Sequence, residues 1–358
     1  MKRVGQLFEK IIDYENLFEA YLMAKKGKRY RGEVLDFSYN AEEELIQIQN
    51  DLIYGTYEVG RYREFYVYHP KKRLIMALPF RDRVVQWAIY KVLYPIYFKR
   101  FIKDSYACIN GRGSHSAAAR IQYWLRQLER QPGKTYYLQM DMSKYFYRIN
   151  HDILLSIISR TIKDKDLMVL LARIIKSEHT KFGIPLGDHF YEQERVDGVG
   201  MPIGNLTSQL FANVYLNEMD QYAKHDMKVR HYIRYMDDIV ILHKDKNELK
   251  EILIESNLFL QHELHLQINN KTRIDNTNHG VDFVGKRIWP THMKLRKETV
   301  KNMKSRLKYI QKQFAFGEVS TDEVRSVLSS YLGLMKHTDS HNLRKKILKE
   351  FVLTRGAE

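Results

Sequence analysis

The sequence feature that most limits the fold is an acidic pair enclosed by two short apolar runs. Residues 232–235 and 239–242 are rich in β-branched and aromatic side chains, and only three residues separate them. The two runs predict the strands of a tight β-hairpin, with Met236, Asp237 and Asp238 in its turn. Adjacent carboxylates repel each other, so such a pair in an apolar hairpin indicates a bound cation. The ordinary alternative is a solvated polar turn.

A third acid ends another predicted strand. Residues 136–140 have the sequence Tyr-Tyr-Leu-Gln-Met and lead directly into Asp141. Carboxylates at the ends of neighbouring strands can hold two Mg²⁺ ions about 3.5–4 Å apart, an arrangement that supports in-line attack of a hydroxyl on a phosphate. We therefore expect Asp141, Asp237 and Asp238 to be the metal ligands and catalytic residues of a nucleotidyl-transfer site, with Mn²⁺ able to replace Mg²⁺.

Periodicities in the rest of the chain predict an α+β fold. Apolar residues recur with helical spacing over 7–22, 41–54 and 82–98, whereas 63–80 alternates as in a hairpin of two strands. No repeat and no low-complexity linker interrupts this pattern. The sequence therefore predicts one continuous body of helices and strands.

The composition changes after about position 286. Between 286 and 312 there are ten Lys or Arg residues and one acid, Glu298. The apolar residues beyond position 299 follow helical spacing on two faces: Val300, Met303, Leu307, Ile310 and Phe314 on the first, and Val324, Val327, Leu328, Tyr331, Leu332 and Met335 on the second. This pattern predicts a small helical C-terminal domain.

Charge and cysteine content limit the partners and the compartment. Lys and Arg total 59 against 43 Asp and Glu, a formal net charge of +16, which favours a polyanionic partner, nucleic acid above all. The single cysteine, Cys108, excludes an intramolecular disulfide and a multi-cysteine zinc site, so we expect a reducing, cytoplasmic location. No apolar run approaches the roughly 20 residues that span a bilayer, and we expect no membrane association.

Several motifs together resemble the reverse transcriptases. Tyr235-Met236-Asp237-Asp238 resembles the catalytic box of that family, and residues 140–146 are similar to its first palm motif, in which an aromatic residue follows an acid after five positions. Residues 202–209, Pro-Ile-Gly-Asn-Leu-Thr-Ser-Gln, are similar to its template- and nucleotide-positioning motif. Further motifs stand in the family's order at Lys71-Lys72-Arg73, 81–86, 266–272 and Phe283-Val284-Gly285.

The resemblance covers nearly the whole chain and implies a right-hand polymerase fold. Its expected parts are N-terminal helices and fingers over 1–128, a palm of antiparallel sheet backed by helices over 129–288, and a helical thumb over 289–358. The basic helix 294–312 would then contact the primer–template duplex, with a solvated charged face as the alternative.

The resemblance also implies roles for individual residues. Asp141 and Asp237 would ligate metal, and Asp238 would complete the acidic cluster. Phe146 would lie under the incoming sugar and exclude a 2′-OH, although a core aromatic is the commoner fate of a Phe. Lys72 and Arg73 would bind the triphosphate of a dNTP, with a solvated turn as the alternative.

The remaining implied site residues concern template, primer and leaving group. Ile203, Gly204 and Gln209 would position the template and the nucleotide. Lys271 would act near the leaving pyrophosphate as a proton donor, whereas a lone Lys in a polar loop is more often simply exposed. The turn at 283–285 resembles a primer grip, where Gly permits close approach of the backbone to the primer.

Departures from the common motif indicate a subclass. Most reverse transcriptases have Gln before the Gly of the positioning motif and end it with Ser-Pro, whereas this chain has Ile203-Gly204 and Ser208-Gln209. The segments 62–65, 209–215 and 287–292 also resemble the corresponding sequences in the enzymes of diversity-generating retroelements in bacteria and phages. That group copies a template-repeat RNA into cDNA, with errors at template adenines, for mutagenic retrohoming. Its implied partners are template RNA, the RNA–DNA hybrid and a small basic, helical, oligomeric accessory protein.

Two other functions remain open. One is a retron or abortive-infection reverse transcriptase in phage defence, although retrons usually have Ala where this chain has Met236. The other is a maturase-like RNA-binding protein with a vestigial site, which would not need three clustered acids that repel phosphate. The basic residues Lys25, Lys26, Lys28, Arg29 and Arg31 either bind template RNA or only solubilise a loop.

Overall fold

A four-stranded antiparallel sheet lies at the centre of the computed structural model, which describes residues 3–68, 72–177, 179–184 and 195–355. Its strands, in spatial order, are β4 (His231–Tyr235), β5 (Asp238–His243), β3 (Tyr136–Asp141) and β6 (Arg273–Asn276). The predicted strand before Asp141 and the predicted hairpin around Asp237 are both confirmed, and they are neighbours in this sheet.

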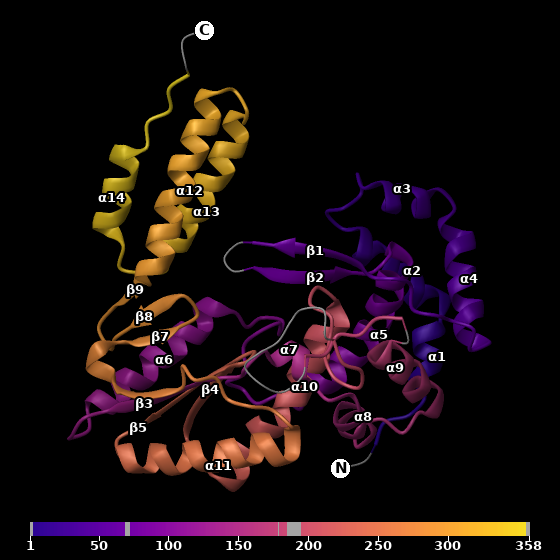
Figure 1. The fold of residues 1–358 in the computed structure, drawn as a ribbon, viewed down its shortest axis with the longest axis horizontal. Helices are drawn as coiled ribbons and strands as arrows, with labels where there is room; N and C mark the ends of the chain where they lie inside the picture. Colours follow the sequence, from indigo (N-terminus) through magenta and orange to yellow (C-terminus); the bar gives the residue numbers. More distant parts are fainter. Residues whose placement is uncertain (1–2, 69–71, 178, 185–194, 356–358) are drawn as a thin grey trace.

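Helices cover both faces of the central sheet (Figure 1). Side chains alternate between the two faces of a strand, so Leu138 and Met140 face one layer and Tyr137 the other. The first layer contains α10 (Leu206–Gln221) and α11 (Lys246–Leu264), and the second contains α6 (Ser114–Glu129). Both cores end where β3 carries Asp141 and β5 carries Asp238, because charged side chains interrupt the apolar rows there.

The N-terminal part is a cluster of helices around the long helix α5 (Phe80–Phe98). Its members are α1 (Phe8–Ile12), α2 (Tyr14–Lys25), α3 (Gly32–Tyr39) and α4 (Ala41–Ile53). The helical predictions for 41–54 and 82–98 are confirmed. The stretch 7–22 forms two helices, because Asp13 takes a non-helical backbone conformation between them.

The predicted hairpin over 63–80 is also confirmed. It consists of β1 (Arg63–Val67) and β2 (Arg73–Ala77), paired antiparallel with Phe65 opposite Ile75. In Figure 1 it projects from the N-terminal helices toward the C-terminal helices across an open space between the ribbons. Lys71 lies outside the described residues.

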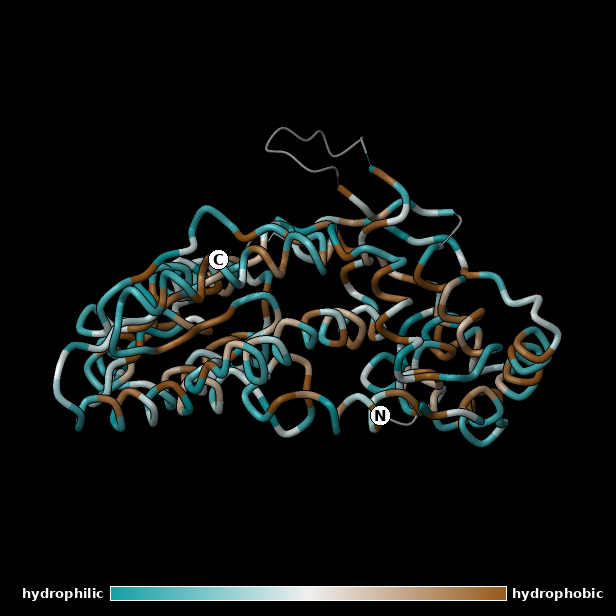
Figure 2. Tube along the Cα trace, turned by 90° about the horizontal axis from the view of Figure 1, so that it is seen from below, coloured by the Kyte–Doolittle hydropathy of each residue, from teal (hydrophilic) through white to brown (hydrophobic). Residues whose placement is uncertain are grey.

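Further helical segments lie between the strands of the central sheet along the chain and just after its last strand. They are α7 (Tyr145–Arg148), α8 (His151–Ser159), α9 (Lys165–Lys176), the π-helical turn at Tyr222–Asp226 and the 3-10 turn at Thr277–His279. Along most helices of the chain the trace alternates between brown and teal (Figure 2), as expected for helices with one buried face. None of the helices in the described ranges is both long and apolar enough to cross a membrane.

A third small sheet and three helices form the C-terminal part. The sheet contains β7 (Val281–Phe283), β8 (Lys286–Ile288) and β9 (Met293–Leu295), and the helices are α12 (Lys297–Ala315), α13 (Thr321–Lys336) and α14 (His341–Glu350). The two predicted C-terminal helices form, with Met303, Leu307 and Met335 among the buried residues of a separate core. The basic helix predicted over 294–312 begins only at Lys297, because residues 293–295 pair with β8 as strand β9. Mixed helix and sheet throughout confirm the α+β prediction.

Candidate active site

The three predicted catalytic acids meet at one end of the central sheet. Asp141, the last residue of β3, lies directly opposite Asp238, the first residue of β5. Asp238 also pairs with Tyr235, which leaves Met236 and Asp237 as a two-residue turn. Met236 has a φ of 56°, the left-handed backbone that tight hairpin turns require. The amide of Met142 donates a hydrogen bond of 3.4 Å to the carbonyl oxygen of Asp237, which joins the turn to β3.

Burial and mutual repulsion favour protonation of this cluster. Burial, together with the nearby Asp141 carboxylate, raises the pKa of Asp237 to about 6, while Arg73 and Arg234 oppose the shift. Burial, together with the Asp141 and Asp237 carboxylates, raises the pKa of Asp238 to about 7. A hydrogen bond from Gln139 and the charge of Arg296 oppose the rise for Asp238.

The donor set fits a divalent cation of the Mg²⁺ type. Its ligands would be hard carboxylate oxygens, and their repulsion is relieved when positive charge lies between them. Within the described ranges, no three His, Cys, Asp or Glu side chains are grouped closely enough to hold an ion by themselves. Mg²⁺ commonly uses one or two carboxylates together with substrate phosphates, and a complete protein cage is not required.

Two polar residues support the acids and were not recognised from the sequence. Asn269 donates its backbone N–H to the Asp141 carbonyl at 2.7 Å, and its side-chain amide lies 3.5 Å from Asp141 Oδ2. Gln139 donates to Asp238 Oδ1 at 3.3 Å and to the carbonyl of Asp282 at 3.0 Å. A polar Gln inside the otherwise apolar strand 136–140 was the available signal for the second residue.

Lys72 and Arg73 of the β1–β2 hairpin have different surroundings. Arg73 is close enough to the acidic cluster to lower the pKa of Asp237. Lys72 places its ammonium 4.3 Å from the centre of the Tyr66 ring and lines a cavity of about 330 Å³ with Leu74. The structure therefore brings Arg73 close to Asp237.

The positioning motif is joined directly to the same hairpin. The amide of Met76 in β2 donates to the carbonyl of Ile203 at 3.0 Å. Gly204 has a φ of 121°, and a Cβ added there would lie 3.1 Å from Ile75 Cγ2. Backbone conformation and limited space therefore both favour glycine at this position. Gln209 is half-buried one turn into α10.

The remaining candidates occupy less distinctive positions. Phe146 is half-buried in α7 against the main core, with its ring 5.6 Å from that of Tyr145. Lys271 is exposed, and its backbone N–H donates to Asn269 Oδ1 at 3.0 Å, which ties its loop to the residue that holds Asp141. The turn at 283–285 has left-handed φ values at both Val284 and Gly285.

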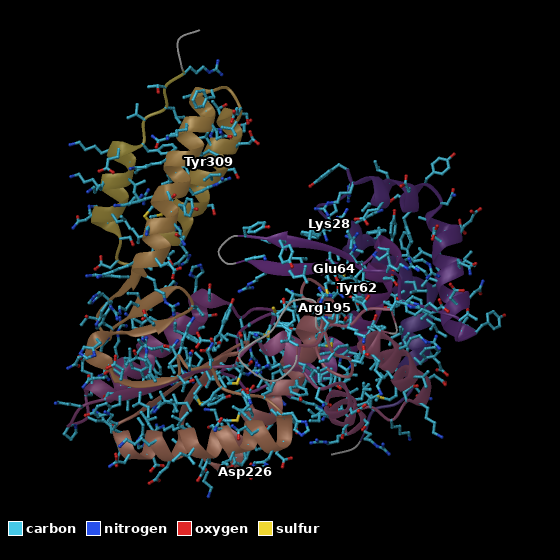
Figure 3. All side chains as sticks on the ribbon, viewed as in Figure 1. Lys28, Tyr62, Glu64, Arg195, Asp226 and Tyr309 are labelled. Carbon is cyan, nitrogen blue, oxygen red and sulfur yellow. The ribbon has the colours of Figure 1, made fainter. Side chains whose placement is uncertain are left out.

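An ion pair braces the base of the hairpin. Arg195 donates two hydrogen bonds to Glu64 in β1, of 2.7 and 3.0 Å. Figure 3 shows this pair beside Tyr62, whereas Tyr309 of α12 lies on the C-terminal helices beyond the open space. Tyr62 accepts a hydrogen bond of 3.1 Å from Asn205, the residue before α10. These contacts hold the hairpin and the positioning motif as one unit beside the acids.

Comparison with known proteins places this site in a family. Residues 69–288 match the family described as reverse transcriptase (RNA-dependent DNA polymerase). The chain is 29% identical over 280 residues to Protein YkfC of Escherichia coli, covering 68% of this chain and 71% of that protein. It is 27% identical over 218 residues to the group II intron-encoded protein LtrA of Lactococcus lactis, covering 59% of this chain and 33% of LtrA.

A solved structure of Candida tropicalis telomerase, in complex with a fragment of telomeric RNA, aligns with 83% of this chain and 56% of its own at a TM-score of 0.46 and 13% identity. The family match includes the hairpin strand β2, the positioning motif and all three acids. The chain belongs to the reverse transcriptase family of RNA-dependent DNA polymerases.

Proposed function

We propose that this chain copies RNA into cDNA by two-metal nucleotidyl transfer at the acidic end of the central sheet. The observation that carries the proposal is the register that sets Asp141 opposite Asp238, with Asp237 in the adjoining turn. All three lie inside the region that matches the reverse transcriptase family. Nothing in RNA binding alone calls for acids gathered in this way, because they repel phosphate.

Each part of the site has a role in the proposed reaction. Asp141 and Asp237 hold two Mg²⁺ ions, and Asp238 completes the acidic cluster. When bound, the ions lower the pKa of the attacking primer hydroxyl and neutralise charge on the phosphates. Arg73 binds the triphosphate of the incoming dNTP through its fork of N–H donors. Lys271 lies on the loop next to Asp141 and supplies a proton toward the pyrophosphate.

The residues around the nucleotide set its selection. Phe146 excludes a ribose 2′-OH, and Ile203, Gly204 and Gln209 position the template and the nucleotide from the start of α10. We assign the fingers and N-terminal helices to 1–128, the palm to 129–288 and the thumb to 289–358. The basic face of α12 then contacts the RNA–DNA hybrid, for which its Lys and Arg residues supply phosphate contacts.

We assign the chain to the diversity-generating retroelement group. The support is the replacement of the usual Gln by Ile203 and of the usual Ser-Pro by Ser208-Gln209. In this assignment the enzyme copies a template-repeat RNA, errs at template adenines and works in the cytoplasm with a small basic, oligomeric accessory protein. A near-duplicate pair of repeats beside the gene, differing at adenine positions, is the expected genomic context.

An intron-encoded or maturase-like role is the second candidate. It is favoured by the similarity to the group II intron-encoded protein, of which the matched region is about one third. A flanking structured intron RNA, in place of the repeat pair, would support this candidate. A flanking noncoding RNA that serves as a retron template would instead support the phage-defence alternative.

Primer extension tests the proposed reaction. The purified chain, given an RNA template, a DNA primer, dNTPs and Mg²⁺, is expected to extend the primer, and Asp237→Asn is expected to abolish extension. Asp275→Asn is a matched control, since Asp275 is an acid of the same sheet but lies at the other end of the β3–β6 pair from Asp141. Undiminished extension by Asp237→Asn would refute the mechanism.

A further inference from the structure

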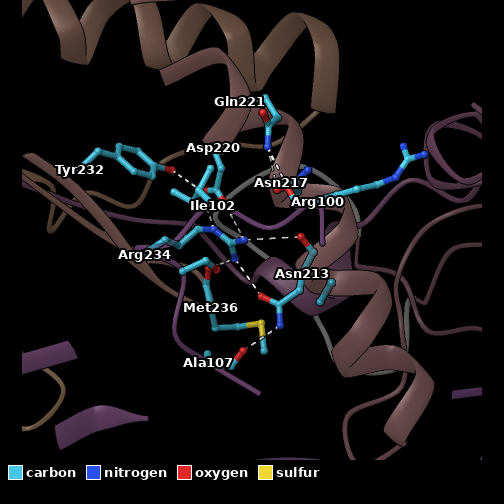
Figure 4. Close-up of polar contacts among 12 residues, drawn as sticks. Arg100, Ile102, Ala107, Asn213, Asn217, Asp220, Gln221, Tyr232, Arg234 and Met236 are labelled. Carbon is cyan, nitrogen blue, oxygen red and sulfur yellow. Dashed lines mark hydrogen bonds and ion pairs between the residues drawn. The ribbon is translucent and has the colours of Figure 1, made fainter. Parts of the chain in front are cut away.

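A fully buried ion pair lies behind the turn that carries Asp237. Arg234 in β4 and Asp220 in α10 are both 0% exposed, and Arg234 Nη2 lies 2.7 Å from Asp220 Oδ2 (Figure 4). Taking two charges out of water is costly, and a packed apolar pair at such a place is often equally stable. Stability alone therefore does not explain this pair.

The guanidinium of Arg234 uses all of its hydrogen-bond donors. Nε and Nη2 each donate to Asp220 at 2.7 Å, and Nη2 also lies 3.5 Å from the carbonyl of Asn213. Nη1 donates to Asn213 Oδ1 at 3.0 Å and to the carbonyl oxygen of Met236 at 2.9 Å. Asp220 accepts one more hydrogen bond, of 2.8 Å, from the Tyr232 hydroxyl. A planar fork with five N–H groups is needed to make these contacts together.

The bond to Met236 acts on the catalytic turn itself. Met236 has a left-handed backbone, which a side chain with a Cβ adopts only at a cost and which surrounding contacts must maintain. Its carbonyl belongs to the peptide that joins Met236 to Asp237. Holding this oxygen fixes the plane of that peptide, and with it the direction of the Asp237 side chain.

The main chain of Arg234 is held from the other side. Its N–H donates to the carbonyl of Asp104 at 2.9 Å, and its carbonyl accepts from the amide of Tyr106 at 3.0 Å. Hydrogen bonds thus hold both the backbone and the side chain of Arg234, which lies two residues before Met236. Movement of the turn relative to α10 would have to break a buried charged contact.

Helix α10 connects this network to the nucleotide-positioning motif. The helix begins at Leu206, just after Gly204, and carries Asn213 in its middle and Asp220 near its end. Its 16 residues form one continuous helix, about 24 Å long at 1.5 Å per residue. One rigid element therefore binds Arg234, which holds the turn of the acids, and follows directly on the nucleotide-positioning loop at its first residue.

We infer that Arg234 is a positioning residue, which holds the Met236–Asp237 turn against α10 so that the Asp237 carboxylate is set for metal binding. The inference rests on the proposed function, because it assumes that Asp237 binds metal. The competing explanation is that Arg234 only neutralises the buried charge of Asp220. A lysine would serve that purpose, but it lacks the fork that reaches both Asp220 and Met236.

The decisive variant is therefore Arg234→Lys in the full chain. We expect its Mn²⁺ affinity, measured by titration with electron paramagnetic resonance, to fall by about tenfold or more, as for other losses of support to a metal ligand. Hydrogen exchange at residues 235–240 should become faster, and affinity for primer–template should not change. Arg160→Lys is the matched control, because Arg160 forms an exposed ion pair of 2.7 Å with Glu218, which lies in α10 as Asp220 does.

The outcomes separate the explanations. Wild-type Mn²⁺ affinity and wild-type exchange in folded Arg234→Lys would overturn the inference and leave charge neutralisation. If Arg234→Lys does not fold, the apolar replacement Arg234→Met with Asp220→Leu is tested in the same way, and wild-type metal affinity there would also overturn it. A wild-type protein that neither binds Mn²⁺ nor extends a primer would refute the proposed function instead.

Discussion

Asp141 and Asp238 face each other across the β3–β5 pair at the one position where both strands carry an acid. Side chains directly opposite in an antiparallel pair have Cβ atoms about 4.5–5.5 Å apart, where like charges destabilise the pairing. Apolar residues fill the next positions inward, Met140 opposite Ile239. The sheet thus concentrates the repulsion between carboxylates at one end, and a cation bound there would relieve it.

The first prediction concerns metal and pH. The unfolded chain releases the protons of Asp237 and Asp238 near the ordinary aspartate pKa of 3.8, whereas the metal-free folded chain holds them to pKa values of about 6 and about 7. The contribution of these groups to stability is therefore present at low pH and is lost as pH rises through that window. Mg²⁺ or Mn²⁺ should raise the melting temperature more at about pH 7.5 than at about pH 5. Differential scanning fluorimetry measures this, and Asp237→Asn should remove the part of the pH dependence that Asp237 contributes and leave the part from Asp238.

The second prediction concerns Gly204. In Gly204→Ala the new Cβ meets Ile75 Cγ2 at 3.1 Å while the backbone keeps a left-handed φ. We expect a loss of about 1–3 kcal/mol of unfolding free energy, together with a higher KM for dNTPs, because the hairpin must move away from the start of α10. Denaturant unfolding and steady-state extension measure the two effects. Gly55→Ala also has positive φ but no close neighbour, and it should lose stability without changing KM.

Much of the fold was predictable because the informative patterns are local. Alternation over 63–80 and 136–141 and helical spacing over 41–54 and 297–314 each depend on residues close in sequence, and these elements form as predicted. The order β4–β5–β3–β6 joins strands more than 90 residues apart, and no local pattern specifies it. Each strand of the third sheet has three residues, too few for a periodicity to appear.

The acids of the candidate site were predictable from the sequence, but the residues that hold those acids in place were less so. Asp141, Asp237 and Asp238 stand out because charge interrupts apolar strands. Arg234 was not recognised, because an Arg next to a turn is usually exposed, and only the packing of α10 against β4 reveals that it is fully buried. Asn269 acts through its backbone, which sequence alone does not reveal.

The third prediction concerns fidelity at Ile203. If Ile203 positions the nucleotide as proposed, its aliphatic side chain cannot donate or accept the hydrogen bond that Gln would offer, and the nascent base pair should be held less tightly. A discriminating hydrogen bond of about 0.5–1.5 kcal/mol corresponds to roughly one order of magnitude or less in selectivity. Ile203→Gln should lower misincorporation at template adenines by up to that factor, as counted by sequencing the cDNA. Ile203→Leu, which stays apolar, is the control. An unchanged misincorporation rate at template adenines in Ile203→Gln would exclude a role of Ile203 in the errors.

The last prediction separates Arg73 from Lys72. Because Arg73 is one of the two cations that lower the pKa of Asp237, and the one in the hairpin, Arg73→Ala should raise the KM for dNTPs by about tenfold or more, the effect of losing a charge-assisted bond to phosphate. It should also raise the pKa of Asp237, so that extension is lost at a higher pH on acidification than in the wild type. Lys72→Ala should not change the pH at which extension is lost on acidification, since the Lys72 ammonium lies over the Tyr66 ring. Steady-state kinetics across pH measures this pH and the KM for dNTPs. An equal shift of this pH in the two variants would contradict the different surroundings of Arg73 and Lys72.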